Sequence, residues 1–337
     1  MQCDFLLSGL LGAPSSIAIK DIAPALAKLL ARGSSSMENL ETSEAWIAQH
    51  FELPSIEGSH SFAAFALLGE KDADPGRSHW LRADPVHLSV NRDRVVLLDG
   101  SQLEIAPTEA DALCRSLQAH FAGDEFVFRV AHPERWYIQS GQPFAIYTHP
   151  LSAVRGRSVA NYWFDGAERA LWQGRLSEMQ MLLHSHPVNE AREEAGHLPI
   201  NGVWFWGAGV LPNLSIQNYS HIIAQDVLLH GLAKLTQARY IDTDEFLWAL
   251  LPLAKSGRTL IVFDRLAKFA AYGEWDAWRE ALAALDQQWF APALSALKNG
   301  KIKAVTIHAP DKKHGVKVAA RRLDSFKVWR REFAVEH

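Results

Sequence analysis

The chain has 337 residues, a formal net charge of −4 and 48% hydrophobic residues, proportions that exclude a disordered or low-complexity protein. Its two cysteines, Cys3 and Cys114, are too few for a disulfide framework, and no apolar run reaches the ~20 residues of a membrane helix. We therefore expect a cytoplasmic protein of one large or two average domains, without a membrane partner. The first residues lack a basic signal-peptide region, so residues 5–11 indicate a buried strand.

Short β-branched or aromatic segments alternate with helix-forming segments along the chain. Strands are expected at residues 4–11, 86–90 with 94–99, 125–130, 135–139, 144–147, 202–206, 239–241, 259–263 and 304–308. Helices are expected at about 21–32, 43–51, 60–69, 107–121, 167–184, 187–196, 224–237, 243–251, 273–297 and 316–331. This alternation predicts an α/β fold around a largely parallel sheet, with a smaller subdomain where strands are densest.

The C-terminal region is strongly basic. Residues 298–331 hold eleven basic and two acidic side chains, a local net charge of +9. Apolar residues at helical spacing predict an amphipathic helix over 316–331; they are Val316, Ala319, Leu323, Phe326 and Phe333. The charge is typical of an anion site, a nucleic-acid surface or a solvated helix face. We favour the solvated face and expect no nucleic-acid partner, because a local charge excess has no groove-reading geometry.

One polar motif surrounds Pro187. This proline ends one helix and starts the next, leaving free backbone N–H groups beside His186. Asn189 and Arg192 are three residues apart on one helix face, so both can point at a single anion. In the alternative, these side chains satisfy backbone groups at the helix junction, because buried polar groups need partners.

A second motif, residues 200–209, leads a strand into a Gly-x-Gly turn at Gly207 and Gly209, with Asn201 at its start. Glycines at the carboxyl end of a strand allow a ligand to approach the backbone closely. The alternative is an ordinary turn that ends the strand.

A third motif places His308, Asp311 and His314 at the end of a strand. Carboxylate and imidazole groups suit Zn or Mn. Lys312 and Lys313 oppose a divalent cation there, because ammonium groups repel it at close range.

Serine nucleophile signals are weak. The chain has neither a Gly-x-Ser-x-Gly elbow nor a Gly-x-x-x-x-Gly-Lys phosphate loop. Ser59 and Ser61 precede an apolar helix, where either is expected to cap its N-terminus.

These motifs together resemble archaeal-type cofactor-independent phosphoglycerate mutases. The resemblance rests on His186-Pro-Val-Asn189, Arg192, Gly196, Pro199, Asn201, Trp204, Trp206, Gly207 and Gly209, on 307–315, and on 81–88. Residues 178–192 and 82–88 are still more similar to a bacterial branch of that group, the RpfE-type regulatory proteins.

The resemblance implies an alkaline-phosphatase-like three-layer sandwich with a mostly parallel central sheet and a smaller α/β cap. The core would comprise residues 1–79 and 166–337, and the cap residues 80–165. The implied ligand-binding residues are His186, Asn189, Arg192, Asn201, Gly207, Gly209, Arg82 and Asp84. The implied metal ligands are Asp311, His314 and His308, and Ser59 is the serine nearest to the family's nucleophile.

The departures from that family decide the expected function. Two departures concern the metal ligands: Ser8 stands where the family has a metal-binding Asp, and Asp311 and His314 are three residues apart rather than four. Residues 97–102 lack the arginines that clamp the phosphate in the family. The chain also ends before the family's final Asp-His pair. In-line phosphoryl transfer needs metals, a nucleophile and a cationic clamp. We therefore expect a non-catalytic pseudoenzyme without a cofactor, which regulates a protein partner or binds a small anionic metabolite. The alternative is a phosphomutase or phosphatase that uses Mn or Zn in a rearranged site.

Overall fold

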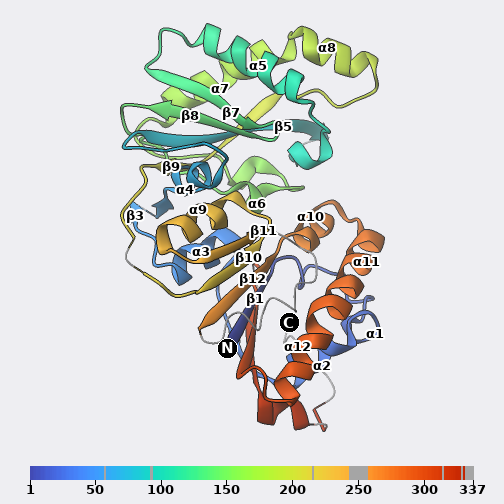
Figure 1. Cartoon of the computed structure of the whole chain (residues 1–337). Coiled ribbons are helices and arrows are strands. Elements are labelled where there is room, and N and C mark those ends of the chain that lie inside the picture. The colour runs from blue at the N-terminus through green and yellow to red at the C-terminus, as the bar shows by residue number, and fades with distance from the viewer. Residues whose placement is uncertain are drawn as a thin grey trace. The chain divides into compact units, whose positions relative to one another are not determined.

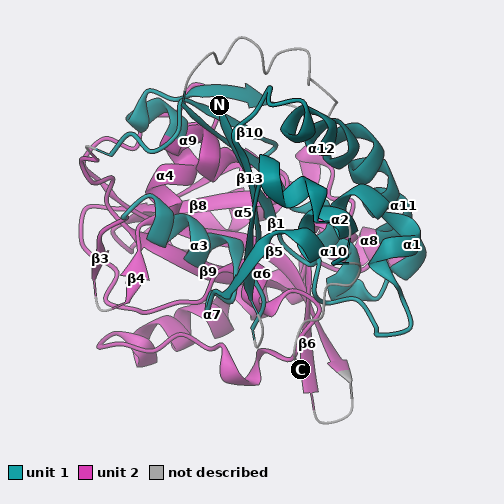
Figure 2. Ribbon diagram, turned by 90° about the horizontal axis from the view of Figure 1, so that it is seen from below, with its two compact units in different colours: residues 1–52, 215–226, 233–337 teal, residues 53–214, 227–232 magenta. Residues whose placement is uncertain are grey.

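The computed structural model describes residues 1–56, 58–91, 94–214, 216–242, 257–312, 315–327 and 329–330. The expected helix 243–251 lies outside these residues. The chain divides into two compact units, residues 1–52 with 215–226 and 233–337, and residues 53–214 with 227–232 (Figure 2). Within the described residues, no helix combines the length and the apolar character that a membrane span requires.

A seven-stranded sheet forms the centre of the first unit. Its strand order is β11 (Arg239–Asp242), β10 (His221–Ala224), β12 (Arg258–Phe263), β1 (Gln2–Leu7), β13 (Ala304–Ala309), β14 (Val316–Arg321) and β2 (Ser34–Met37). The first five of these strands are parallel, with Gln2 beside both Arg258 and Ala304, whereas β14 is antiparallel to its two neighbours. The predicted α/β fold with a mostly parallel central sheet is confirmed.

Helices cover both faces of this sheet (Figure 1). Phe5 and Ile307 point to the face covered by α2 (Pro24–Arg32), α11 (Trp275–Leu285) and α12 (Ala291–Lys298), where they join Leu26, Trp278 and Leu297 in one core. On the opposite face Trp46 of α3 (Ser43–His50) contacts His308 of β13. Successive strand residues point to opposite faces, so His308 and Ile307 serve different layers.

Two further helices of this unit are α1 (Ile19–Ile22) and α10 (Arg265–Tyr272). A five-residue π-helical turn, Asp286–Phe290, interrupts the helix expected over 273–297. The buried Asp286 carboxylate accepts hydrogen bonds from the backbone of Ala25 and Leu26, at 3.1 and 2.7 Å. It thereby satisfies two of the free N–H groups at the start of α2.

The helix predicted over 316–331 is wrong. Residues 316–321 form strand β14, and a short 3-10 helix, Arg322–Phe326, follows. Val316, Val318 and Ala320 are buried and alternate with less buried residues, which is the period of a strand. Leu323 and Phe326 are exposed instead of forming a buried helix face.

The second unit contains a five-stranded antiparallel sheet. Its strands are β5 (His79–Asn91), β6 (Arg94–Asp99), β7 (Phe126–His132), β8 (Arg135–Ser140) and β9 (Gly202–Gly209), and β5 pairs with β6, β8 and β9. Strands β5 and β6 are antiparallel, with Asn91 opposite Arg94. The segment 144–147 is not a strand, because only Tyr147 makes an isolated bridge, to Asp165. The unit comprises residues 53–214 and 227–232 and includes β9. The expected division into a core and a cap at 80–165 stays a prediction.

Two helices supply most of the apolar side chains that pack on this sheet. Leu113 and Leu117 of α5 (Pro107–His120) and Trp172 and Leu176 of α7 (Arg169–His184) join Trp136 and Phe205 in the core. The other elements are β3 (Ser55–Ile56), β4 (Ser59–His60), α4 (Phe62–Gly69), α6 (Leu151–Val154) and α8 (Pro187–Glu194), while α9 (Val227–Thr236) spans the division between the units.

Candidate functional site

Three potential metal ligands meet in the first unit. His308 lies on β13, His50 ends α3, and Glu38 follows β2. One ligand atom of each lies within 4.8 Å of the others, and the described residues contain no other such group of three. The two carboxylate oxygens of Glu38 lie 2.9 and 3.2 Å from Nδ1 of His308, and one of them lies 3.9 Å from Nε2 of His50.

Helix α3 fixes the orientation of His50. The helix starts at Thr42, whose hydroxyl accepts a hydrogen bond from the backbone N–H of Ala45 at 3.1 Å. One turn before the helix ends, Trp46 stacks on His50, with ring centroids 3.8 Å apart. Nδ1 of His50 donates to the carbonyl oxygen of Trp46 at 3.0 Å. The other ring nitrogen, Nε2, therefore faces Glu38.

The pKa values of both Glu38 and His50 are shifted below their ordinary values. Burial by itself would raise the pKa of Glu38, but the hydrogen bond and charge of His308, with the charges of His50 and Lys317, hold it below its ordinary value. Burial lowers the pKa of His50. Lys317 lies beside His308 on the neighbouring strand.

Of the three predicted metal ligands, His308 is the one that lies in this group. It is buried next to two potential ligands that the sequence patterns did not indicate, Glu38 and His50. Asp311 is not a member of this group, and its backbone N–H donates to the carbonyl oxygen of Leu40 at 3.1 Å. His314 lies outside the described residues. No spacing signal identifies Glu38, which is 270 residues from its partner His308.

The predicted anion-binding residue Asn189 joins two backbone segments. Its side chain is 1% exposed. Nδ2 donates to the carbonyl oxygens of Leu183 at 2.7 Å and Ile200 at 2.9 Å, while Oδ1 accepts from the N–H of Ile200 at 2.8 Å. These contacts connect the end of α7 to the residues before β9, and they favour the alternative in which Asn189 satisfies a helix junction.

Arg192 and His186 are also engaged by protein groups. The guanidinium of Arg192 donates to Glu109 at 2.7 Å, to the carbonyl oxygen of Leu198 at 2.9 Å and to that of Leu103. Nδ1 of His186 accepts from the N–H of Val188 at 3.1 Å, and its Nε2 lies 2.9 Å from the hydroxyl of Ser116. Binding of an anion by these residues stays a prediction.

Arg82 and Asp84 form a buried ion pair on β5. Arg82 Nε and Nη2 each donate to one oxygen of Asp84 at 2.8 Å, and the indole N–H of Trp206 donates to the same carboxylate at 2.7 Å. The guanidinium lies 5.0 Å from the ring centres of Tyr137 and Trp206. Burial alone would lower the pKa of Arg82, but the charge of Asp84 raises it above its ordinary value. Burial raises the pKa of Asp84, and the charge of Arg82 opposes that shift. The two hydrogen bonds from one guanidinium to both carboxylate oxygens have the geometry of a bidentate ion pair.

The two glycines of the Gly-x-Gly turn allow close packing. Gly207 has a φ of +70°, and a Cβ atom there would lie 2.8 Å from the backbone nitrogen of Ala63. Gly209 has a φ of +150°, and its Cβ atom would lie 2.1 Å from the hydroxyl of Ser61. Both glycines thus allow β9 to approach the start of α4, so the turn has a structural reason besides any ligand.

Two further residues considered for the site, Asn201 and Ser59, also have partners within the protein. The Asn201 side chain accepts from the N–H of Leu88 at 2.7 Å and donates to its carbonyl oxygen at 3.1 Å. Ser59 belongs to β4 and pairs with Ile56. Ser61 directly precedes α4 but makes no side-chain capping hydrogen bond.

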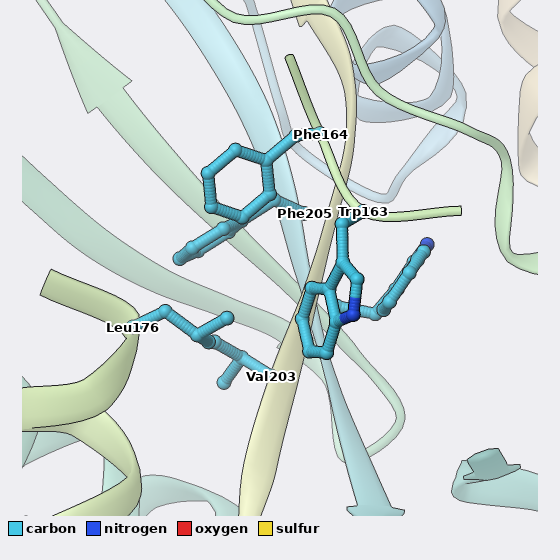
Figure 3. Close-up of a pocket in the computed structure, with 6 residues that line it drawn as sticks. Trp163, Phe164, Leu176, Val203 and Phe205 are labelled. Atoms are coloured by element: carbon cyan, nitrogen blue, oxygen red, sulfur yellow. The ribbon is translucent and has the colours of Figure 1, made fainter. Parts of the chain in front are cut away.

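A small pocket in the second unit is apolar. Its lining residues are Trp163, Phe164, Leu176, Val203, Trp204 and Phe205, whose side chains surround the space in Figure 3. The one polar atom among these side chains whose partner is known, the indole N–H of Trp204, donates to the carbonyl oxygen of His149 at 2.9 Å. The lining contains no ionisable side chain and therefore offers nothing to pair with an anion.

The contacts of Glu70 indicate that the stability of the fold depends on pH. Its carboxylate accepts from Arg135 at 2.7 and 3.1 Å and from Tyr137 at 3.1 Å. Burial by itself would raise the pKa of Glu70, but these hydrogen bonds and the arginine charge hold it below its ordinary value. In the unfolded chain, Glu70 therefore binds its proton more tightly than in the folded protein. The ionised carboxylate stabilises the fold at pH values above its ordinary pKa of about 4.3, and this stabilisation is lost as the pH falls through the pKa of Glu70 in the folded protein.

We expect the urea midpoint of Glu70→Gln to lie below that of the wild type at pH 7, and the difference to shrink between about pH 5 and pH 3. The exposed variant Glu193→Gln is the control and should follow the wild type throughout. A difference that grows on acidification would contradict this assignment.

Known proteins resemble parts of the chain. A probable 2,3-bisphosphoglycerate-independent phosphoglycerate mutase of Geobacter sulfurreducens is 28% identical over 138 residues, 40% of this chain and 34% of that protein. The 2,3-bisphosphoglycerate-independent phosphoglycerate mutase of Methanococcus aeolicus is 40% identical over 67 residues, 18% of this chain and 16% of that protein. The matched segments thus span about a third of these relatives or less. No protein-family model matches the chain.

The fold has a counterpart among solved structures. The PH0037 protein of Pyrococcus horikoshii superposes with a TM-score of 0.53 at 14% identity, over 95% of this chain and 87% of that one. The two proteins share a fold. The expected resemblance to cofactor-independent phosphoglycerate mutases is confirmed as a distant and partial sequence similarity.

Proposed function

We propose that the chain is a non-catalytic regulatory or metabolite-binding protein on an alkaline-phosphatase-like, phosphoglycerate-mutase-like fold, as its RpfE-type resemblance implies. The observation that supports this proposal most directly is that Arg82 pairs with the carboxylate of Asp84, and Arg192 with that of Glu109. Phosphoryl transfer needs cationic groups directed at the phosphate. These arginines are the cations predicted to bind an anion, and both are directed at protein groups instead.

The start of the sheet supports the same proposal. Ser8 directly follows β1, where the resemblance implies a metal-binding aspartate, and its hydroxyl hydrogen-bonds with that of Ser43. A serine paired in this way does not replace an anionic ligand of a divalent cation. Both cysteines are free and buried, in keeping with the reducing cytoplasm that we propose as its location.

The alternative is a metal-dependent phosphomutase or phosphatase with a rearranged site. It is supported by the names of the relatives, which are phosphoglycerate mutases, and by the group of Glu38, His50 and His308, which could hold a metal. Turnover separates the two functions, because only the alternative requires a bond to phosphorus to break.

We expect no turnover above the buffer background when the full chain is assayed against phosphoglycerates and a panel of phosphomonoesters with Mn, Zn or Mg. Release of inorganic phosphate and conversion of 3-phosphoglycerate to 2-phosphoglycerate are the two readouts. Metal-dependent turnover that is lost in His308→Ala but kept in the exposed variant His197→Ala would overturn the non-catalytic proposal.

A further inference from the structure

We propose that Glu38, His50 and His308 form a zinc site, two of whose three ligands, Glu38 and His50, are residues that the sequence patterns did not indicate. The site goes beyond the proposed function, because it does not depend on whether the chain catalyses a reaction. It is assembled from three parts of one unit: the end of edge strand β2, the C-terminus of helix α3, and strand β13.

The donor set selects the type of cation. Two imidazole nitrogens and one carboxylate oxygen suit Zn²⁺ and other divalent transition metals. Mg²⁺ and Ca²⁺ prefer oxygen ligands alone. The ammonium group of Lys317 acts on the same carboxylate and opposes any cation, so only a metal that bonds strongly to nitrogen should overcome it.

The distances from Glu38 to the two histidines are near those of a tetrahedral zinc centre. With bonds of about 2.0–2.1 Å to nitrogen and oxygen, the ligand atoms of such a centre lie roughly 3.3 Å apart. The carboxylate of Glu38 lies 2.9 and 3.2 Å from Nδ1 of His308 and 3.9 Å from Nε2 of His50. These separations lie on both sides of the ideal value, so a small movement of the carboxylate would seat the ion.

His50 is already oriented as zinc-binding histidines are. Its Nδ1–H donates to the carbonyl oxygen of Trp46, which fixes the tautomer, and the indole of Trp46 stacks on the ring. Partners of this kind position the ligand nitrogen before the metal arrives. The side chains of Glu38 and His50 are 12% and 17% exposed, so a cation can enter from solvent.

One nitrogen of His50 is left for the ion. Nδ1 of His50 is engaged by the carbonyl oxygen of Trp46, and Nε2 lies 3.9 Å from Glu38 Oε1, which is too long for a hydrogen bond. A zinc ion between these two atoms would bond to both of them and leave a fourth position for water or an anion.

Isothermal titration calorimetry of the metal-free full chain with ZnCl₂ tests the proposal. We expect one equivalent of zinc and no measurable heat with MgCl₂. Loss of an outer-sphere partner costs roughly 10–100-fold in metal affinity, so His308→Ala and His50→Gln should each cost at least as much. The controls Asp311→Ala and His197→Ala should bind like the wild type.

Co²⁺ provides a second readout, because a four-coordinate cobalt centre absorbs visible light strongly and is detected without any variant. We expect this spectrum from the wild type and from Asp311→Ala, and circular dichroism melts to show that His50→Gln folds. Absence of zinc binding, binding unchanged in both histidine variants, or binding lost only in Asp311→Ala would overturn the site. Zinc binding together with phosphoester turnover would overturn the non-catalytic proposal and keep the site.

Discussion

Replacing Arg82 with methionine is expected to lower the free energy of unfolding by about 3–5 kcal/mol, because it leaves a buried carboxylate without its cation. Asp84 is fully buried and Arg82 is 5% exposed, so water cannot substitute for the lost partner. The hydrogen bond from Trp206 remains, but one neutral donor does not neutralise the charge. Urea denaturation followed by far-UV circular dichroism measures the loss.

A matched surface variant provides the control. Arg169 faces Asp165 at 3.9 Å in the same unit, and both side chains are largely exposed. Exposed pairs contribute at most about 1 kcal/mol, so Arg169→Met should leave the urea midpoint nearly unchanged. If Arg82→Met is as harmless as Arg169→Met, the ion pair does not stabilise the fold.

Removing both charged groups of the pair distinguishes the cost of burying them from the attraction between them. The double variant Arg82→Met with Asp84→Leu should recover most of the stability lost in Arg82→Met, because apolar groups of similar volume often replace a buried pair without loss. If the double variant is less stable than the single one, the Asp84 carboxylate stabilises the unit without Arg82, through the hydrogen bond that it accepts from Trp206.

Local patterns predicted much of the fold correctly. Pro107 and Pro187 start α5 and α8 at their first residues, as expected from proline's fixed φ and missing N–H. The strand expected at residues 94–99 forms β6 with the same bounds. In each case a few adjacent residues determine the backbone conformation, so the sequence contains the signal.

Long-range pairing explains what the patterns missed. Val316 and Ala319 have helical spacing, yet β13 and β2 pair with this segment and make it a strand. The segment Ser34–Met37 has four exposed side chains and no apolar alternation, so no local pattern indicated β2. Tertiary contacts override local preference at these positions.

The candidate zinc site also combines a residue that a local pattern indicates with residues that only long-range pairing brings together. His308 was predicted as a ligand because it ends an apolar strand. Glu38 follows an exposed serine-rich strand and His50 ends a helix without any metal motif, so only the sheet order brings them beside His308. Spacing rules identify metal ligands within one segment of the chain, whereas these three candidate ligands come from three separate segments.

The second large effect is expected at Asn189, whose replacement with alanine should cost about 3 kcal/mol. The variant leaves the carbonyl oxygens of Leu183 and Ile200 and the N–H of Ile200 without this partner. Each buried polar group that loses its partner costs about 1–3 kcal/mol, although relaxation recovers part of the sum. Thermal and urea unfolding of the variant measure the cost, and the exposed variant Asn161→Ala in the same unit should be close to neutral.

The same variant tests the two roles that the sequence left open for Asn189. If the side chain is structural, inorganic phosphate should shift the melting temperatures of the wild type and of Asn189→Ala equally, because neither binds the anion there. If it binds an anion, phosphate should stabilise the wild type alone, since a ligand stabilises only a fold that binds it. We expect equal shifts, because every polar atom of the Asn189 side chain already has a backbone partner within 2.9 Å.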